Sequence, residues 1–168
     1  SDADVEAMFV DFVPAQVACL PEYSDLLPGV ADVTQAIQAS GIKIGVSTGF
    51  TRVMVDVLLA AAIEQGFTPD ATVAGDEVHN GARPKPHMVY KNLDLLDISP
   101  IESVIKVDDT VGGVGEGLNA GCWAVGVSRY SNYMDINSRE EEARLSDAEI
   151  ERRNALSAAK LRAAGCPI

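Results

Sequence analysis

The chain has 168 residues, with 13 Lys and Arg against 25 Asp and Glu, which gives a formal net charge of −12 at pH 7. Hydrophobic residues make up 47% and charged residues 23%, as is typical of one globular domain with a buried core. The acidic excess argues against nucleic acid as a partner, and no apolar run approaches the ~20 residues of a membrane span. Cys19, Cys122 and Cys166 form no zinc or redox motif, so we expect thiols in a cytoplasmic protein.

The N-terminal part of the chain predicts a helix followed by a turn. Apolar residues recur at helical spacing from Val5 to Val13, and Pro14 is expected to kink or end that helix. The sequence from Leu27 to Val30 predicts a turn into a short helix, which Gly41 ends as a C-cap.

From residue 42 onward, predicted strands alternate with predicted helices. The strands are expected at 42–46, 71–74, 103–107 and 123–127. The helices are expected at 52–65, 87–95, 114–120 and about 146–164. Because the strands are continuous apolar runs, we expect an α/β fold, a parallel sheet with helices on both faces and with Trp123 in the core. Ligands of such sheets bind beyond the carboxyl ends of the strands.

Thr48 and Gly49 lie between the first strand and the helix that follows it. A hydroxyl group and free backbone N–H groups at the start of a helix can bind an anion. Thr48 or Thr51 could equally serve as an ordinary N-cap. The residues alone leave both interpretations open.

Charged groups are predicted at two further strand-associated positions. Arg83 and Lys85 alternate with prolines, and a stiff loop with two cations suits a phosphoryl group, although a solvated basic turn is the alternative. Asp108 and Asp109 directly follow the third strand, and adjacent carboxylates suit Mg²⁺. A helix N-cap with a charged neighbour is the alternative there.

This order of a hydroxyl, a cation and carboxylates resembles the haloacid dehalogenase superfamily of phosphohydrolases, whose core is a Rossmann-like sheet. Four runs are similar to phosphonoacetaldehyde hydrolases of that superfamily: GIKIGVSTGFTR (41–52), GARPKPHMVYKN (81–92), IKVDDT (105–110) and EGLNAGCWAVGV (116–127). The segment that ends at Leu26–Val30 is also similar, so the resemblance extends over nearly the whole chain.

The resemblance implies a hydrolase that converts phosphonoacetaldehyde to acetaldehyde and phosphate with Mg²⁺, through a lysine imine and an aspartyl-phosphate. It implies that Thr48 and the Gly49 amide bind phosphoryl oxygens. It implies that Arg83 neutralises the phosphoryl group and orients the nucleophile. Asp109, with Asp108 beside it, would belong to the Mg²⁺ site.

The chain departs from the family at the covalent groups. The sequence lacks the Asp-x-Ala-Gly-Thr motif that carries the nucleophile, and it lacks the cap segment with the imine lysine. Asp11 ends an apolar run but lacks the rest of the motif. We therefore expect residues 1–27 to be a remnant of the helical cap, residues 28–168 to be the core without its first strand, and the chain alone to be inactive. A final strand is expected to begin at the end of the chain.

One further departure concerns the metal site. Gly113 stands where some members have an acid, four residues after Asp109, and Asp108 replaces a glycine of other members. Asp108 could therefore supply the second carboxylate.

Two other functions stay open. The chain could belong to a related phosphatase with another substrate, because the missing cap would select the substrate. It could also be a catalytically silent remnant that binds phosphate or Mg²⁺. In each case we expect a small anionic ligand as partner and no membrane, and the N-terminal helix could pair two copies into a homodimer.

Overall fold

The computed structural model describes residues 2–166, without the side chains of residues 2, 3 and 6. The α-helices are α1 (Asp2–Cys19), α2 (Val30–Ala39), α3 (Arg52–Glu64), α4 (His87–Leu96), α5 (Val111–Ala120), α6 (Arg139–Glu142) and α7 (Asp147–Ala163). The strands are β1 (Gly45–Thr48), β2 (Ala71–Ala74), β3 (Ile105–Asp108) and β4 (Trp123–Gly126). A final strand is expected to begin at residues 165–168; residues 165 and 166 are not in a strand, and residues 167 and 168 lie outside the described residues.

Within the described residues the strands form two parallel pairs, not one continuous sheet. In one pair Gly45 of β1 lies opposite Ala71 of β2, and in the other Ile105 of β3 lies opposite Trp123 of β4. Helix α4 packs on β1 and β2, and α5 packs on β3, β4 and α4. The predicted α/β class with parallel strands and helices is confirmed.

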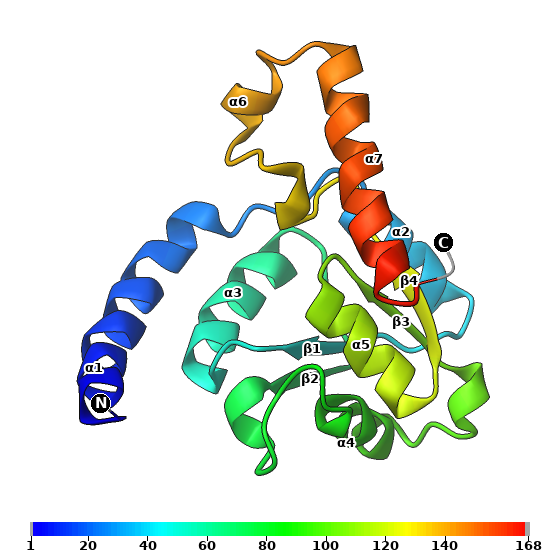
Figure 1. The fold of residues 1–168 in the computed structure, drawn as a ribbon. Helices are drawn as coiled ribbons and strands as arrows, with labels where there is room; N and C mark the ends of the chain where they lie inside the picture. The colour runs from blue at the N-terminus through cyan, green and yellow to red at the C-terminus, as the bar shows by residue number, and fades with distance from the viewer. Residues whose placement is uncertain (1, 167–168) are drawn as a thin grey trace.

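Helix α5 is shared by the two apolar clusters of the core. Its Val114 packs with Ala124 of β4 and Leu161 of α7. Its Ala120 packs with Val89 of α4 in the second cluster. In these two clusters α5 thus packs against β4 and α7 through one residue and against α4 through the other (Figure 1).

Two glycines allow α5 to lie close against β3. A Cβ atom at residue 117 would lie 2.7 Å from Lys106 Cβ, and one at residue 113 would lie 1.9 Å from Asp108 Cγ. The helix also begins earlier than the predicted residue 114, because Thr110 Oγ1 accepts a hydrogen bond from the Gly113 N–H and caps it. Glycine-rich sequence at this position thus marks close packing and not a loop.

Helix α1 lies at one side of the molecule, where it contacts α3 (Figure 1). It continues through Pro14, so of the two predicted effects of this proline the end of the helix is wrong, and a kink stays a prediction. The proline removes a hydrogen bond to the carbonyl of Val10, and because Val10 is exposed, water can bind that carbonyl instead. Among residues 2–166, none of the helices combines the length and apolar character that crossing a membrane requires.

The prediction of a buried Trp123 is also wrong, since this residue is 65% exposed and its Nε1 donates a hydrogen bond to the Glu102 carbonyl. Ile105 and Val107 of the neighbouring strand are likewise exposed. Side chains alternate along a strand, so Lys106 turns toward α5 while Ile105 and Val107 turn to the opposite face. The described residues leave that face open, contrary to the expectation of burial on both faces.

The first strand begins later than predicted, at Gly45 instead of residue 42. The Asp70 carboxylate accepts a hydrogen bond of 2.8 Å from the Ile44 N–H, and regular pairing with β2 starts only at the next residue. As a consequence, Ser47 and Thr48 are the last residues of the strand and not part of the turn behind it.

Candidate functional site

Arg83 brings the three predicted site segments together. Its Nη2 donates a hydrogen bond of 2.7 Å to the Ser47 carbonyl and lies 3.0 Å from Asp108 Oδ2. Its Nε lies 3.4 Å from Glu116 Oε2. Among the described residues the Nη1 atom has no hydrogen-bond or ion-pair partner. The guanidinium group is therefore fixed on two sides, and Nη1 remains for an anion.

Asp108 is committed to groups of the protein. Its Oδ1 accepts hydrogen bonds from the Thr110 N–H (3.0 Å) and the Thr110 hydroxyl (2.8 Å), and its Oδ2 lies 3.0 Å from Lys106 Nζ. Burial acts to raise the pKa of Asp108, but the charges of Lys106 and Arg83 outweigh it and hold the pKa below its usual value. Asp108 is therefore an ionised carboxylate with both oxygens in use.

Asp109 has a different environment. Its side chain is half-buried, and Ser131 Oγ donates a hydrogen bond of 2.6 Å to its backbone carbonyl. Burial raises the pKa of Asp109 above its usual value, and the neighbouring charge of Asp108 adds to this. Of the two predicted metal ligands, Asp109 is the one whose carboxylate no ion pair of the described residues engages.

The carboxylate of Asp108 fills the space that a side chain at residue 113 would need. A Cβ atom there would lie 1.9 Å from Asp108 Cγ and 2.1 Å from each carboxylate oxygen. Asp108 and Gly113 are thus sterically matched. An acid at residue 108 in place of one at residue 113 fits this geometry, and its role as a metal ligand stays a prediction.

Thr48 and Gly49 lie at the carboxyl end of β1. The Thr48 hydroxyl accepts a hydrogen bond of 3.2 Å from the Phe50 N–H, and Thr51 forms no side-chain cap at the start of α3. The Arg52 N–H at that helix start donates instead to Asp76 Oδ1, at 2.9 Å. Thr51 therefore occupies the N-cap position of α3 without a capping hydrogen bond from its side chain, and the role of Thr48 in anion binding stays a prediction.

The loop 83–86 separates its two cations. Lys85 is exposed, and its Nζ donates a hydrogen bond of 2.6 Å to the Asn80 carbonyl. Asn119 of α5 donates a hydrogen bond of 2.8 Å to the Pro84 carbonyl and holds the loop against α5. Only Arg83 of this pair contacts the other site segments.

The sequence reasoning missed Lys106 and Glu116. Glu116 is fully buried, and its Oε2 lies 3.0 Å from Ser47 Oγ and 3.5 Å from Lys106 Nζ. Lys106 Nζ also donates to Ser47 Oγ, at 2.9 Å. A signal was available, because Lys106 shares a strand face with Asp108, and Gly113, Glu116 and Gly117 have the spacing of one helix face.

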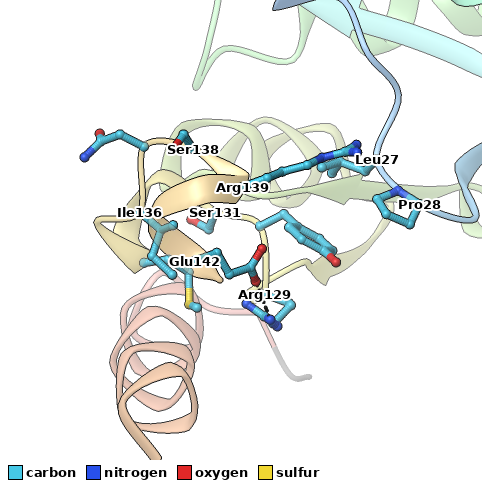
Figure 2. A pocket seen from close by; sticks show the side chains of 11 residues that line it. Leu27, Pro28, Arg129, Ser131, Ile136, Ser138, Arg139 and Glu142 are labelled. Atoms are coloured by element: carbon cyan, nitrogen blue, oxygen red, sulfur yellow. Dashed lines mark ion pairs between the residues drawn. The ribbon is translucent and has the colours of Figure 1, made fainter. Parts of the chain in front are cut away.

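A cavity of about 340 Å³ lies between the linker residues Leu27 and Pro28 and the segment 129–142 (Figure 2). Leu27 and Pro28 form one wall, and the segment 129–142 forms the others, with an ion pair between Arg129 and Glu142. Ser131 lines it and reaches Asp109 through the hydrogen bond described above. None of the predicted site residues lines this cavity.

Comparison with known proteins decides the family. A sequence model of the haloacid dehalogenase-like hydrolases matches residues 1–121. The chain belongs to the haloacid dehalogenase-like hydrolases. It is also homologous to phosphonoacetaldehyde hydrolases, with 41% identity to that of Aeromonas hydrophila and 41% to that of Paraburkholderia xenovorans, over 98% of this chain in both cases. It spans 59% and 61% of the lengths of these two relatives.

A solved structure agrees with the assignment of this chain to the haloacid dehalogenase-like hydrolases. A phosphonoacetaldehyde hydrolase-like protein from Oleispira antarctica is 36% identical, with a TM-score of 0.95. The match covers 99% of this chain and 60% of that one. The arrangement of strands and helices described above is therefore one that the larger relative shares.

Proposed function

We propose that this chain is the phosphate-binding core of a hydrolase that converts phosphonoacetaldehyde and water to acetaldehyde and phosphate. In that reaction the C–P bond breaks with its electron pair on carbon, which takes a proton, while the oxygen of water joins phosphorus. The contacts of Arg83 with Ser47, which directly precedes Thr48, and with Asp108, which directly precedes Asp109, carry the proposal. The homology to phosphonoacetaldehyde hydrolases supports the choice of substrate.

The phosphoryl group would lie between the end of β1 and Arg83. The Thr48 hydroxyl and the Gly49 N–H can donate to its oxygens from one side, and Arg83 Nη1 can donate from the other. Hydrogen bonds to a charged oxygen are about twice as strong as neutral ones, and the site holds these donors in place before the ligand arrives.

The charges of the site call for a further cation. Arg83 and Lys106 balance Asp108 and Glu116, so the added charge of Asp109 makes the cluster negative toward an incoming phosphoryl dianion. Within the described side chains no cluster of three or more acidic, His or Cys groups is placed to hold a metal. Mg²⁺ commonly takes one or two carboxylates together with phosphate oxygens, so Asp109 fits as its ligand. The ion would neutralise charge on the phosphoryl oxygens.

We assign binding and charge neutralisation to this chain, and not the covalent steps. The sequence carries neither the Asp-x-Ala-Gly-Thr nucleophile nor the cap segment of the imine lysine. In this proposal Asp108 holds Arg83 and Lys106 in place, and Asp109 faces the ligand. Without a group that attacks phosphorus, the bound phosphonate stays intact.

We further propose a cytoplasmic location and a homodimer. Cys19 and Cys122 are thiols, as is typical of a reducing compartment. Met8, Phe9 and Phe12 of α1 expose apolar surface that a second copy could cover.

The experiment adds phosphonoacetaldehyde to the purified chain with Mg²⁺, follows binding by calorimetry and assays acetaldehyde in the same solution. We expect binding without acetaldehyde release, and weaker binding by Thr48→Val, which keeps the shape of the side chain but removes its hydroxyl. Thr68→Val, the same change at an exposed residue between α3 and β2, is the control. Absence of binding would refute the proposed substrate, and tight binding of a bulky phosphate ester instead would favour a related phosphatase.

A further inference from the structure

Glu116 is a buried carboxylate that the proposed function does not use. Its side chain is 0% exposed, and Oε2 faces three groups: Ser47 Oγ at 3.0 Å, Arg83 Nε at 3.4 Å and Lys106 Nζ at 3.5 Å. Its second oxygen, Oε1, is buried without a hydrogen-bond partner among the described residues. The three groups come from β1, from the loop before α4 and from β3, so one side chain of α5 contacts three separate segments.

Stability alone does not account for a carboxylate at this position. Taking a charge out of water is costly, and well-packed apolar residues usually stabilise a core as well as a buried ion pair does. Glu116 also leaves one buried oxygen unsatisfied, which adds to the cost. What the carboxylate supplies beyond a packed side chain is a fixed orientation of the groups around it.

We propose that Glu116 is a positioning residue, which holds Ser47 and the Arg83 guanidinium so that Thr48, Gly49 and Arg83 Nη1 face the same phosphoryl group. This inference rests on the proposed function of the site. Ser47 directly precedes Thr48, and its hydroxyl and carbonyl are held by Glu116 and Arg83, respectively. The planar guanidinium group has Nη2 on Ser47 and Asp108 and Nε against Glu116, which fixes the direction of Nη1.

Charge and position predict opposite effects of removing this carboxylate. A negative charge 3.4 Å from Arg83 Nε opposes an incoming anion, so its removal would strengthen phosphate binding if Glu116 acted through charge alone. If Glu116 positions Arg83 and Ser47, its removal weakens binding although the site becomes more positive. The sign of the change therefore separates the two roles.

The test measures binding of inorganic phosphate with Mg²⁺ by calorimetry in three variants. We expect Glu116→Leu to raise Kd about tenfold, the equivalent of one charge-assisted hydrogen bond. Glu116→Gln should restore most of the affinity, because its amide oxygen can still accept from Ser47 Oγ and Lys106 Nζ. Glu102→Leu removes the same charge at an exposed position and should leave Kd unchanged. A Glu116→Leu variant that binds as tightly as the wild type, or more tightly, would overturn the inference.

A second readout is independent of the ligand. Arg83 Nε is buried without a hydrogen-bond partner, so the exchange of its proton, followed by NMR, reports how firmly the guanidinium group is held. Exchange should be slow in the wild type and in Glu116→Gln, and faster in Glu116→Leu, where the guanidinium group is free to move. If Glu116→Leu does not fold, the double variant Lys106→Met/Glu116→Leu removes both charges together, and the same rise in Kd and in exchange rate is expected. If the wild type binds no phosphate, the proposed function fails, whereas unchanged exchange refutes the positioning role by itself.

Discussion

Asp108 and Asp109 are adjacent in the sequence, yet their carboxylates have different partners and opposite pKa shifts. Asp108 turns toward α5, where Lys106 and Arg83 hold its pKa below the usual value. Asp109 is half-buried, and its pKa is raised by burial. Asp108 is the last residue of β3 and Asp109 follows the strand, so two adjacent aspartates have different surroundings. In the proposed function Asp108 orients the cations and Asp109 faces the ligand.

The steric match between Asp108 and Gly113 can be tested by exchanging the two residues. Gly113→Asp alone should destabilise the protein by about 3 kcal/mol, because its Cβ would lie 1.9 Å from Asp108 Cγ and overpacking carries costs of this order. In the double variant Asp108→Gly/Gly113→Asp, that part of the loss should be relieved. Urea unfolding of the wild type, both single variants and the double variant measures the coupling. Additive effects would mean that the two sites are independent, contrary to the structure.

The sequence could predict some site residues and not others. Thr48, Arg83 and Asp109 could be predicted because strand ends and a proline-stiffened loop mark their positions. Glu116 could not be assigned a role, since its partners come from three segments that only the fold brings together. The partner of Lys85 could not be predicted from the sequence either. The conformation of the loop directs the Lys85 side chain to the Asn80 carbonyl and away from the site.

At the scale of elements, the linker between α1 and α2 is held by side chains from two other helices. Gln65, at the end of α3, accepts a hydrogen bond of 2.8 Å from the Leu26 N–H and donates one of 2.9 Å to the Ser24 carbonyl. Arg139 of α6 donates to the Leu26 carbonyl at 3.1 Å. These bonds fix the direction in which the chain leaves α1 and enters α2 (Figure 1).

Loss of this linker contact should make the linker easier to cleave. We expect Gln65→Ala to increase the rate of chymotrypsin cleavage at Tyr23 or Leu26 roughly thirtyfold, since two hydrogen bonds of about 1 kcal/mol each no longer oppose local opening. Gln38→Ala, which removes an amide bound elsewhere, to the Thr68 carbonyl, should leave the rate near that of the wild type. Equal rates in the two variants would show that Gln65 does not restrain the linker.

The ion pair between Arg52 and Glu77 ties α3 to the turn after β2 and predicts a pH dependence. The hydrogen bond from Arg52, and then that from the Ala74 N–H, lower the pKa of Glu77 from 4.5. A carboxyl group whose pKa is lower in the folded state than in the unfolded state stabilises the folded protein at pH values above the unfolded-state pKa. This stabilisation is lost as the pH falls from the unfolded-state pKa through the folded-state pKa.

The unfolding free energy of the wild type should therefore exceed that of Glu77→Gln at pH 6. For an ion pair near the surface, the difference should be at most about 1 kcal/mol. The difference should shrink as pH falls from 5 to 3. Urea unfolding across this pH range measures it, with Glu64→Gln on α3 as the control for an exposed charge. A difference that grows toward pH 3 would contradict the assignment.

Element boundaries show which sequence patterns decided the fold. Gly41 has a positive φ of 85° and follows the end of α2, as predicted, and Gly66 with a φ of 94° does the same after α3. The strand 71–74 was predicted with its observed bounds. The start of α5 was missed because the glycines that serve close packing against β3 also weaken the helical pattern. Burial of Trp123 was predicted from its place at the start of an apolar strand. The exposure of its side chain depends, however, on which elements cover that face of β4, and the described residues leave it open.

At the scale of the whole molecule, side chains join the two pairs of strands across the site. Ser47 belongs to β1, Lys106 and Asp108 to β3, and Glu116 and Arg83 complete the contact from α5 and a loop. The cluster balances two positive charges against two negative charges in a chain of net charge −12. In the proposed function, this local balance keeps the net charge of the chain from being concentrated around Arg83.

The same balance predicts that phosphate binding depends on a divalent cation. With Asp109 included, the site is negative, so removal of Mg²⁺ by a chelator should weaken phosphate binding at least tenfold. Calorimetry with and without chelator measures this, and Asp109→Asn should reduce the difference between the two conditions. Equal affinity without Mg²⁺ would show that Asp109 does not hold the cation.

The central claim is that Arg83 binds the phosphoryl group, and the most direct measurement is titration of inorganic phosphate with Mg²⁺ into the wild type and Arg83→Ala. Arg152→Ala, which removes an exposed arginine of α7, is the matched control. The account predicts binding by the wild type and the control, and a loss of at least tenfold in Arg83→Ala, as removal of a charge-assisted hydrogen bond implies. Equal affinity of Arg83→Ala and the wild type would contradict it.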